Sequence, residues 1–199
     1  MSLENVQGFS YCHVVSRDIV TNDRWDEITG QFKTNTILQY DSEFDKVIKW
    51  GIPALVRRQV RRNDNTGTNP VELFKLCLGN LEENLKPKLP VNYKKAITDY
   101  LREMVKLIKE KIESHWEDLN IFEEVLFVLT VPAEYSEKEK AIMRDCAYKA
   151  GLINVKSTDL LQFTTEPEAA AVYCMEHCLK EHDLSDTDSA ESEYLQARN

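Results

Sequence analysis

Two stretches of the sequence decide the fold. The first is Leu126-Phe127-Val128-Leu129-Thr130-Val131-Pro132-Ala133. The second follows an amphipathic segment and is Thr165-Glu166-Pro167-Glu168-Ala169-Ala170-Ala171. Residues 125–131 are apolar, rich in β-branched side chains and too few for an ordinary helix, so they predict a central strand buried on both faces. Pro132 has no amide hydrogen and should end this strand. The order of parts is strand, helix, strand and helix, which is typical of an α/β fold.

The segment between the two stretches has the pattern of a capped amphipathic helix. Ser136 and Glu139 are spaced as in a capping box, and Gly151 supplies the left-handed residue that closes the helix. The residues expected to face inward recur at helical spacing: Ala141, Ile142, Cys146, Ala147 and Ala150.

A shorter strand is expected near residues 160–164, followed directly by the second helix. Pro167 suits the first turn of that helix, where its missing donor costs nothing. Glu166 then lies at the helix N-terminus, where the helix dipole favours an ionised carboxylate. It also follows the carboxyl end of a strand, the edge at which open α/β sheets usually bind ligands.

These motifs resemble the ATPase domain of the heat shock protein 70 chaperones, through Val131-Pro132-Ala133, Ala150-Gly151-Leu152 and Glu166-Pro167-x-Ala169-Ala170-Ala171. The resemblance is closer to the divergent heat shock 70 kDa protein 12 type and its fungal relatives, and it covers most of residues 8–173. It implies an α/β chain with the actin-like ATPase (ribonuclease H-like) fold. We expect most of lobe one only, a mixed sheet flanked by helices.

The same resemblance implies roles for three residues and the cofactors ATP and Mg²⁺. Pro132 matches a hinge-like proline that senses nucleotide, and Lys140 matches a basic relay residue on the following helix. Glu166 matches the carboxylate that orients water around magnesium at the γ-phosphate, which makes it the candidate catalytic residue. Taken singly, each has an ordinary alternative: a strand stop, a surface lysine and a helix cap.

The chain departs from the family where phosphate would be held. The family folds two glycine-rich β-hairpins around the phosphates, because a Cβ would block the approach of backbone amides. Here all six glycines are isolated in the sequence, and neither hairpin motif is present. We therefore expect a chain that alone neither binds ATP tightly nor hydrolyses it. A truncated product, a mispredicted gene and a degenerate paralogue all fit this pattern.

The expected domains are a partial nucleotide-binding domain over residues 8–180, with a helical subdomain at about 70–120, and a disordered acidic tail over 181–199. Within the subdomain, Asn92 should cap a long helix through Leu119. Its apolar stripe is expected to pack on the sheet: Ile97, Leu101, Val105 (or Met104), Ile108, Ile112 and Trp116. The alternative function is a non-enzymatic module that uses helix 92–119, or the exposed lobe surface, to bind a protein partner or to self-associate.

Shorter elements are expected elsewhere. Strands are predicted at 9–15 and 34–40, a turn or short strand at 25–28, and a strand pair around Gly51 within 47–56. A short helix is predicted within 70–79, with its apolar residues inward: Leu73, Phe74, Leu76 and Cys77.

Composition indicates a globular chain, with 42% hydrophobic and 30% charged residues and a net charge of −9. No membrane-spanning segment or secretory signal is visible, and five unpatterned cysteines favour reduced thiols, so a cytoplasmic location is expected. Cys174, His177, Cys178 and His182 do not match a zinc site as well as they match ordinary thiols and histidines. The arginines of residues 57–62 indicate a solvated strand end, so neither nucleic acid nor membrane is an expected partner.

Two observations would contradict this interpretation. One is Val128 at the margin of a sheet, and the other is Glu166 facing open solvent away from any crevice.

Overall fold

The computed structural model describes residues 6–25, 28–55 and 70–175. The arginine cluster at 57–62 and the predicted acidic tail at 181–199 lie outside the described residues. The chain divides into two compact units, the first comprising residues 1–125 and 136–158 and the second residues 126–135 and 159–199. Each unit is described by itself.

The first unit begins with short antiparallel strands. Their bounds are β1 (Val6–Gln7), β2 (Ser10–Cys12), β3 (Ile19–Thr21), β4 (Arg24–Trp25), β5 (Ile28–Thr29) and β6 (Thr34–Asn35). The pairs are β1 with β6, β2 with β3, and β4 with β5. The predicted strand at 9–15 is thus shorter than expected. Of the predicted turn or short strand at 25–28, Trp25 and Ile28 pair with each other in β4 and β5, and residues 26–27 lie outside the described residues.

A three-stranded antiparallel sheet follows in the order β8–β7–β9, formed by β7 (Ile37–Tyr40), β8 (Val47–Trp50) and β9 (Val71–Glu72). The predicted strand at 34–40 is confirmed, although it is divided between β6 and β7. The side chains of Leu38 and Tyr40 are fully buried, so β7 is the central strand of this sheet in both pairing and burial.

The predicted strand pair around Gly51 is wrong in its second half. The chain leaves β8 through Gly51, which has a φ of 63° and donates its amide to the carbonyl of Ile37 at 3.0 Å. It then forms the short helix α1 (Ile52–Leu55), whose first amide donates to Thr34 Oγ1 at 3.0 Å. Pro53 cannot donate to a ladder but is tolerated in a first helical turn, so the local sequence favours this helix.

Residues 70–79 form β9 and then a 3₁₀ helix, η1 (Phe74–Cys77), in place of a single short helix. Phe74 is buried as expected. Leu73 is exposed, which contradicts its predicted inward position. It takes the left-handed conformation just before η1, so the turn itself directs this side chain.

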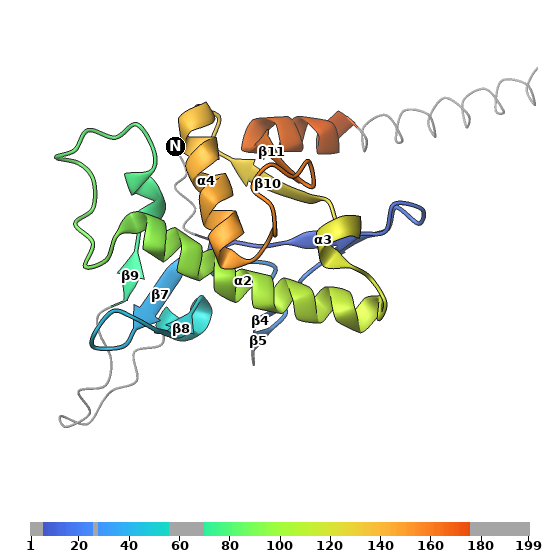
Figure 1. Cartoon of the computed structure of the whole chain (residues 1–199), viewed down its shortest axis with the longest axis horizontal. Coiled ribbons are helices and arrows are strands. Elements are labelled where there is room, and N and C mark those ends of the chain that lie inside the picture. The colour runs from blue at the N-terminus through green and yellow to red at the C-terminus, as the bar shows by residue number, and fades with distance from the viewer. Residues whose placement is uncertain (1–5, 26–27, 56–69, 176–199) are drawn as a thin grey trace, which may run out of the picture. The chain divides into compact units, whose positions relative to one another are not determined.

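The long helix is confirmed as α2 (Tyr93–His115), and Asn92 Oδ1 accepts the amide hydrogen of Lys94 at 2.9 Å. It ends earlier than Leu119, because Trp116 has an extended backbone. The apolar stripe is inward: Ile97, Val105 and Ile112 are buried. As Figure 1 shows, α2 packs against α4 and runs beside the β7–β8 sheet. The stripe therefore belongs to the core of the first unit.

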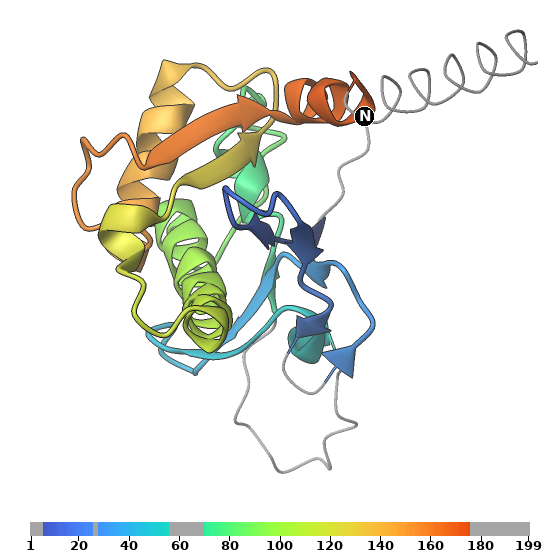
Figure 2. The same ribbon diagram turned by 90° about the vertical axis from the view of Figure 1, so that its right-hand side faces the viewer.

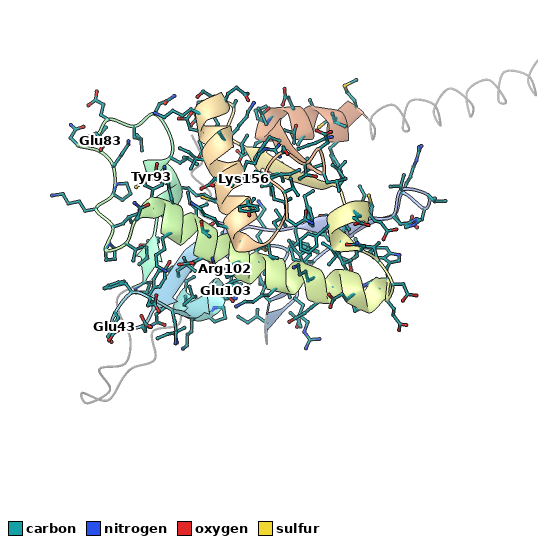
Figure 3. All side chains as sticks on the ribbon, in the orientation of Figure 1. Glu43, Glu83, Tyr93, Arg102, Glu103 and Lys156 are labelled. Carbon is teal, nitrogen blue, oxygen red and sulfur yellow. The ribbon has the colours of Figure 1, made fainter. Side chains whose placement is uncertain are left out.

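A buried carboxylate fastens α2 to this sheet. Asp99 accepts hydrogen bonds from the Tyr40 hydroxyl at 2.9 Å and from Lys95 Nζ at 2.7 Å, and it also pairs with Arg102. Arg102, labelled in Figure 3, additionally donates to the carbonyl of Lys149 in α4 at 3.3 Å. Because a buried charge is costly unless it is paired, these donors are what make Asp99 tolerable at this depth.

The capped helix is confirmed as α4 (Glu137–Ala150). The Ser136 amide donates to Glu139 Oε2 at 2.9 Å, and Ser136 Oγ accepts the amide hydrogen of Lys138 at 3.3 Å. Gly151 closes the helix with a φ of 81°. Cys146, Ala147 and Ala150 are buried as predicted, Ile142 is half-buried, and Ala141 is exposed, which corrects its assignment to the inner face. The short helix α3 (Ile121–Glu124) precedes the second unit.

The second unit contains two parallel strands, β10 (Phe127–Val131) and β11 (Leu161–Thr165), which Figure 2 shows side by side and pointing the same way. Both predicted strands are confirmed, but the prediction that the first is central is wrong for the described residues. There β10 pairs with β11 alone, and Val128 is 53% exposed. The apolar run suggested burial on both faces, whereas burial alternates along β10 because only one face is covered.

Candidate functional site

The carboxyl ends of β10 and β11 form the edge that holds two of the three candidate residues. The strands are in register from Phe127 with Leu161 to Val131 with Thr165, and the Phe127 amide donates to the carbonyl of Leu160 at 2.8 Å. Pro132 and Glu166 each follow the last paired residue of their strand. Parallel pairing therefore brings them to neighbouring positions on one edge.

Glu166 starts a helix to which the described residues 166–175 belong, and Figure 2 shows this helix directly after β11. Thr165 and Glu168 cap it reciprocally. Glu168 Oε2 accepts the Thr165 amide hydrogen at 2.9 Å, while the Glu168 amide donates to Thr165 Oγ1 at 3.2 Å. This is a capping box, and its Thr-x-x-Glu spacing was readable in the sequence but was missed.

The capping box changes the interpretation of Glu166. A helix cap was its ordinary alternative role, and Thr165 fills that role instead. Glu166 is exposed, and among the described residues its carboxylate has no hydrogen-bond or ion-pair partner. The side chain is therefore not needed to hold its own helix in place. Its exposure is also one of the two observations that were to count against the resemblance.

Pro132 ends β10 as predicted and opens a turn, in which its carbonyl accepts the Tyr135 amide hydrogen at 3.1 Å. Lys140 is in α4, in the other unit, and its Nζ lies 3.0 Å from Glu137 Oε1. This i,i+3 ion pair gives Lys140 a local partner that sequence analysis did not foresee. The structure thus brings Pro132 and Glu166 together, and it places Lys140 in a local helix pair.

The described residues do not fit Mg-ATP on their own. The edge offers the carboxylates of Glu134 and Glu166, and the described part of the chain contains no cluster of three or more histidine, cysteine, aspartate or glutamate residues able to hold a metal ion. Glycines at tight positions serve the fold: a Cβ at Gly8 would lie 2.5 Å from the carbonyl oxygen of Phe32, and one at Gly51 would collide with Thr34. No glycine is left at this edge to form a phosphate cradle.

Of the cysteine and histidine residues considered for zinc, Cys174 is exposed, and His177, Cys178 and His182 lie outside the described residues.

Comparison with known proteins supports the predicted relationship in part. No family model matches the chain. Human heat shock 70 kDa protein 12B is 45% identical over 62 residues, which are 31% of this chain and 9% of that protein. Mouse heat shock 70 kDa protein 12A is 33% identical over 79 residues, covering 40% of this chain and 11% of that protein. Human heat shock 70 kDa protein 12A matches to the same extent.

These similarities relate the chain to heat shock 70 kDa proteins of types 12A and 12B, and the mixture of helices and strands agrees with that relationship. The matched parts span about a tenth of the length of these relatives. No helix in the described part of the chain is both long and apolar enough to cross a bilayer.

Proposed function

We propose that this chain is part of a heat-shock-70-type ATPase domain of the actin-like fold, and that it does not hold nucleotide without further parts of such a domain. The observation that carries the proposal is the in-register parallel pairing of β10 with β11, which sets Pro132 and Glu166 side by side at a strand edge. Similarity to the 12A and 12B proteins supports the same assignment.

In this proposal Glu166 supplies the carboxylate of the nucleotide site, Pro132 fixes the strand end beside it, and Lys140 is the basic residue of the following helix. Bound Mg-ATP would contribute the phosphoryl group and its neutralising cation. The chain itself would contribute the position of the Glu166 carboxylate. This carboxylate is not needed to cap its helix, because Thr165 and Glu168 form the capping box. Positioning and charge stabilisation account for most of phosphoryl-transfer catalysis, so the missing cradle removes most of the rate.

Isothermal titration of the full chain with Mg-ATP tests this proposal. We expect no heat of binding at micromolar nucleotide and no hydrolysis above the buffer rate. Saturable micromolar binding that the Glu166→Gln variant weakens would show that the chain holds nucleotide unaided, and would contradict the proposal.

The alternative function, a protein-interaction module, takes two forms that the structure treats differently. Binding through the apolar stripe of helix 92–119 is disfavoured, since the stripe is buried within the first unit. Binding through the exposed lobe surface is supported by β10, where Val128 is 53% and the preceding Leu126 is 50% exposed.

A further inference from the structure

The outer edge of β10 presents backbone groups that are ready to pair. Because the Phe127 amide bonds to the carbonyl of Leu160, alternate residues of β10 face β11. The amides and carbonyls of Val128 and Thr130 then point to the opposite side. Among the described residues no strand pairs with β10 on that side, and no backbone bond is made to either residue there.

This edge carries none of the features that normally block strand addition. Natural edge strands are protected by charged side chains, prolines or bulges. The five residues of β10 include no charged residue and no proline, and the β10–β11 register has no shift. The side chains of Val128 in β10 and of Leu126 just before it add about half-exposed apolar surface.

The surroundings of the edge have one sign of charge. The described residues of the second unit, 126–135 and 159–175, contain the carboxylates of Glu134, Asp159, Glu166 and Glu168 and no lysine, arginine or histidine. Asp159 precedes β11, while the three glutamates follow the carboxyl ends of the strands. Both ends of the sheet are therefore acidic. The same charge opposes pairing of two copies of the chain, whose net charge is −9.

We propose that β10 accepts an extended peptide segment of another protein as an added strand, and that this segment has apolar β-branched residues in its middle and basic residues at its ends. Main-chain hydrogen bonds to Val128 and Thr130 supply the affinity, as in other cases of strand addition. The acidic ends of the sheet select the basic flanks. Nothing in this binding requires a nucleotide site, so it stands or falls separately from the proposed ATPase relationship.

The test is fluorescence anisotropy with the full chain and a labelled peptide that has lysine at both ends and alternating valine and threonine between them. We expect saturable binding that weakens as salt is raised, because exposed charges are screened. A peptide with glutamate at both ends should bind about tenfold more weakly by the same electrostatic argument. Methylation of the backbone nitrogens on its pairing edge should abolish binding. Equal binding of all three peptides, or none at millimolar protein, would overturn the proposal.

Two variants locate the binding at β10. Val128→Pro removes an outward amide that does not bond to β11. It should weaken binding of the lysine-ended peptide by about tenfold or more. Val128→Lys keeps the amide but adds a positive charge, so it should shift preference toward the glutamate-ended peptide. Ile48→Lys, the same kind of change at an exposed position of β8, should leave both affinities unchanged. An Ile48→Lys effect as large as that of Val128→Lys would overturn the assignment to β10.

Sedimentation velocity without peptide completes the test. We expect a monomer. A dimer that Val128→Pro dissociates would show that a second copy of the chain occupies the edge, and would overturn the proposal of a basic partner.

Discussion

The Tyr40 hydroxyl shows how strongly one side chain can depend on its surroundings. Tyr40 is fully buried, and its hydroxyl donates to the Asp99 carboxylate at 2.9 Å. Burial and the negative charge of Asp99 raise the pKa of Tyr40 well above its ordinary value. Removing this donor leaves Asp99, among the described residues, with the partly exposed Lys95 and Arg102.

Tyr40→Phe should therefore lower the free energy of unfolding by about 2 kcal/mol, the usual loss for a hydrogen bond to a charged group. Urea denaturation measures it. Tyr93→Phe is the matched control, because the described residues show no hydrogen bond from the Tyr93 hydroxyl, and it should change stability by less than about 0.5 kcal/mol. Equal effects of the two changes would contradict the Tyr40–Asp99 contact.

The buried Tyr40 hydroxyl also predicts that the stability of the chain depends on pH. Burial also raises the pKa of Tyr100, so both tyrosines hold their protons more tightly in the folded chain than in the unfolded one. Their contribution to stability is full below the unfolded pKa of about 10 and is lost as pH rises above it, because the unfolded chain ionises first. Urea midpoints measured from pH 9 to about pH 11 should fall, and the fall should be smaller in Tyr40→Phe. An unchanged slope in the variant would contradict this assignment.

At the scale of elements, local signals correctly predicted the start of α2 and both ends of α4, but not the end of α2. Asn92, the Ser136–Glu139 box and Gly151 act through atoms a few residues apart, so their sequence determines the outcome. The depth of β10 is different, because it depends on neighbours distant in sequence. An apolar run alone does not distinguish a central strand from one with a single covered face.

Ser136→Ala tests the importance of the α4 cap. It removes the acceptor for the Lys138 amide and one side of the capping box, so stability should fall by about 1 kcal/mol. Thermal unfolding followed by circular dichroism measures the change. Ser157→Ala, in an exposed turn, is the control and should unfold like the parent chain.

The candidate site, like the elements, was predictable only where it depends on residues close together in the sequence. Pro132 and Glu166 were each predicted at the end of a strand, but the parallel pairing that brings them to one edge is a finding of the structure. The Thr165–Glu168 box and the Lys140–Glu137 pair were not predicted, although both have ordinary helix spacings. Both partners, Glu137 and Glu168, lie within three residues of the predicted site residues on the same helices.

At the scale of the whole molecule, packing is uneven. The middle of α2 is buried against α4, η1 and the β7–β8 sheet, whereas the β2–β3 hairpin carries highly exposed residues such as Val14, Val15 and Ile19. Buried, well-contacted helices open only with large free energies, while exposed hairpins open locally.

Hydrogen exchange should reflect this difference. Amides of residues 96–105 should exchange most slowly, and those of residues 10–21 should exchange quickly, when followed by mass spectrometry or NMR. Equally slow exchange in the β2–β3 hairpin would show packing that its exposure does not explain.

The two observations that were to count against the resemblance bear on the whole molecule. Among the described residues Val128 lies on a strand that pairs with β11 alone, and Glu166 is exposed, so both observations count against the resemblance. Similarity to the 12A and 12B proteins is independent of that geometry. The relationship to these proteins is therefore supported by sequence similarity and not by the position of β10 or Glu166.

The parallel alignment of β10 and β11 is the claim on which the site and the open edge both depend. Nuclear Overhauser contacts in the isotope-labelled chain test it most directly. We predict backbone contacts that advance together, from Phe127 near Leu161 to Val131 near Thr165. Contacts that run in opposite directions along the two segments, or none between them, would contradict the account.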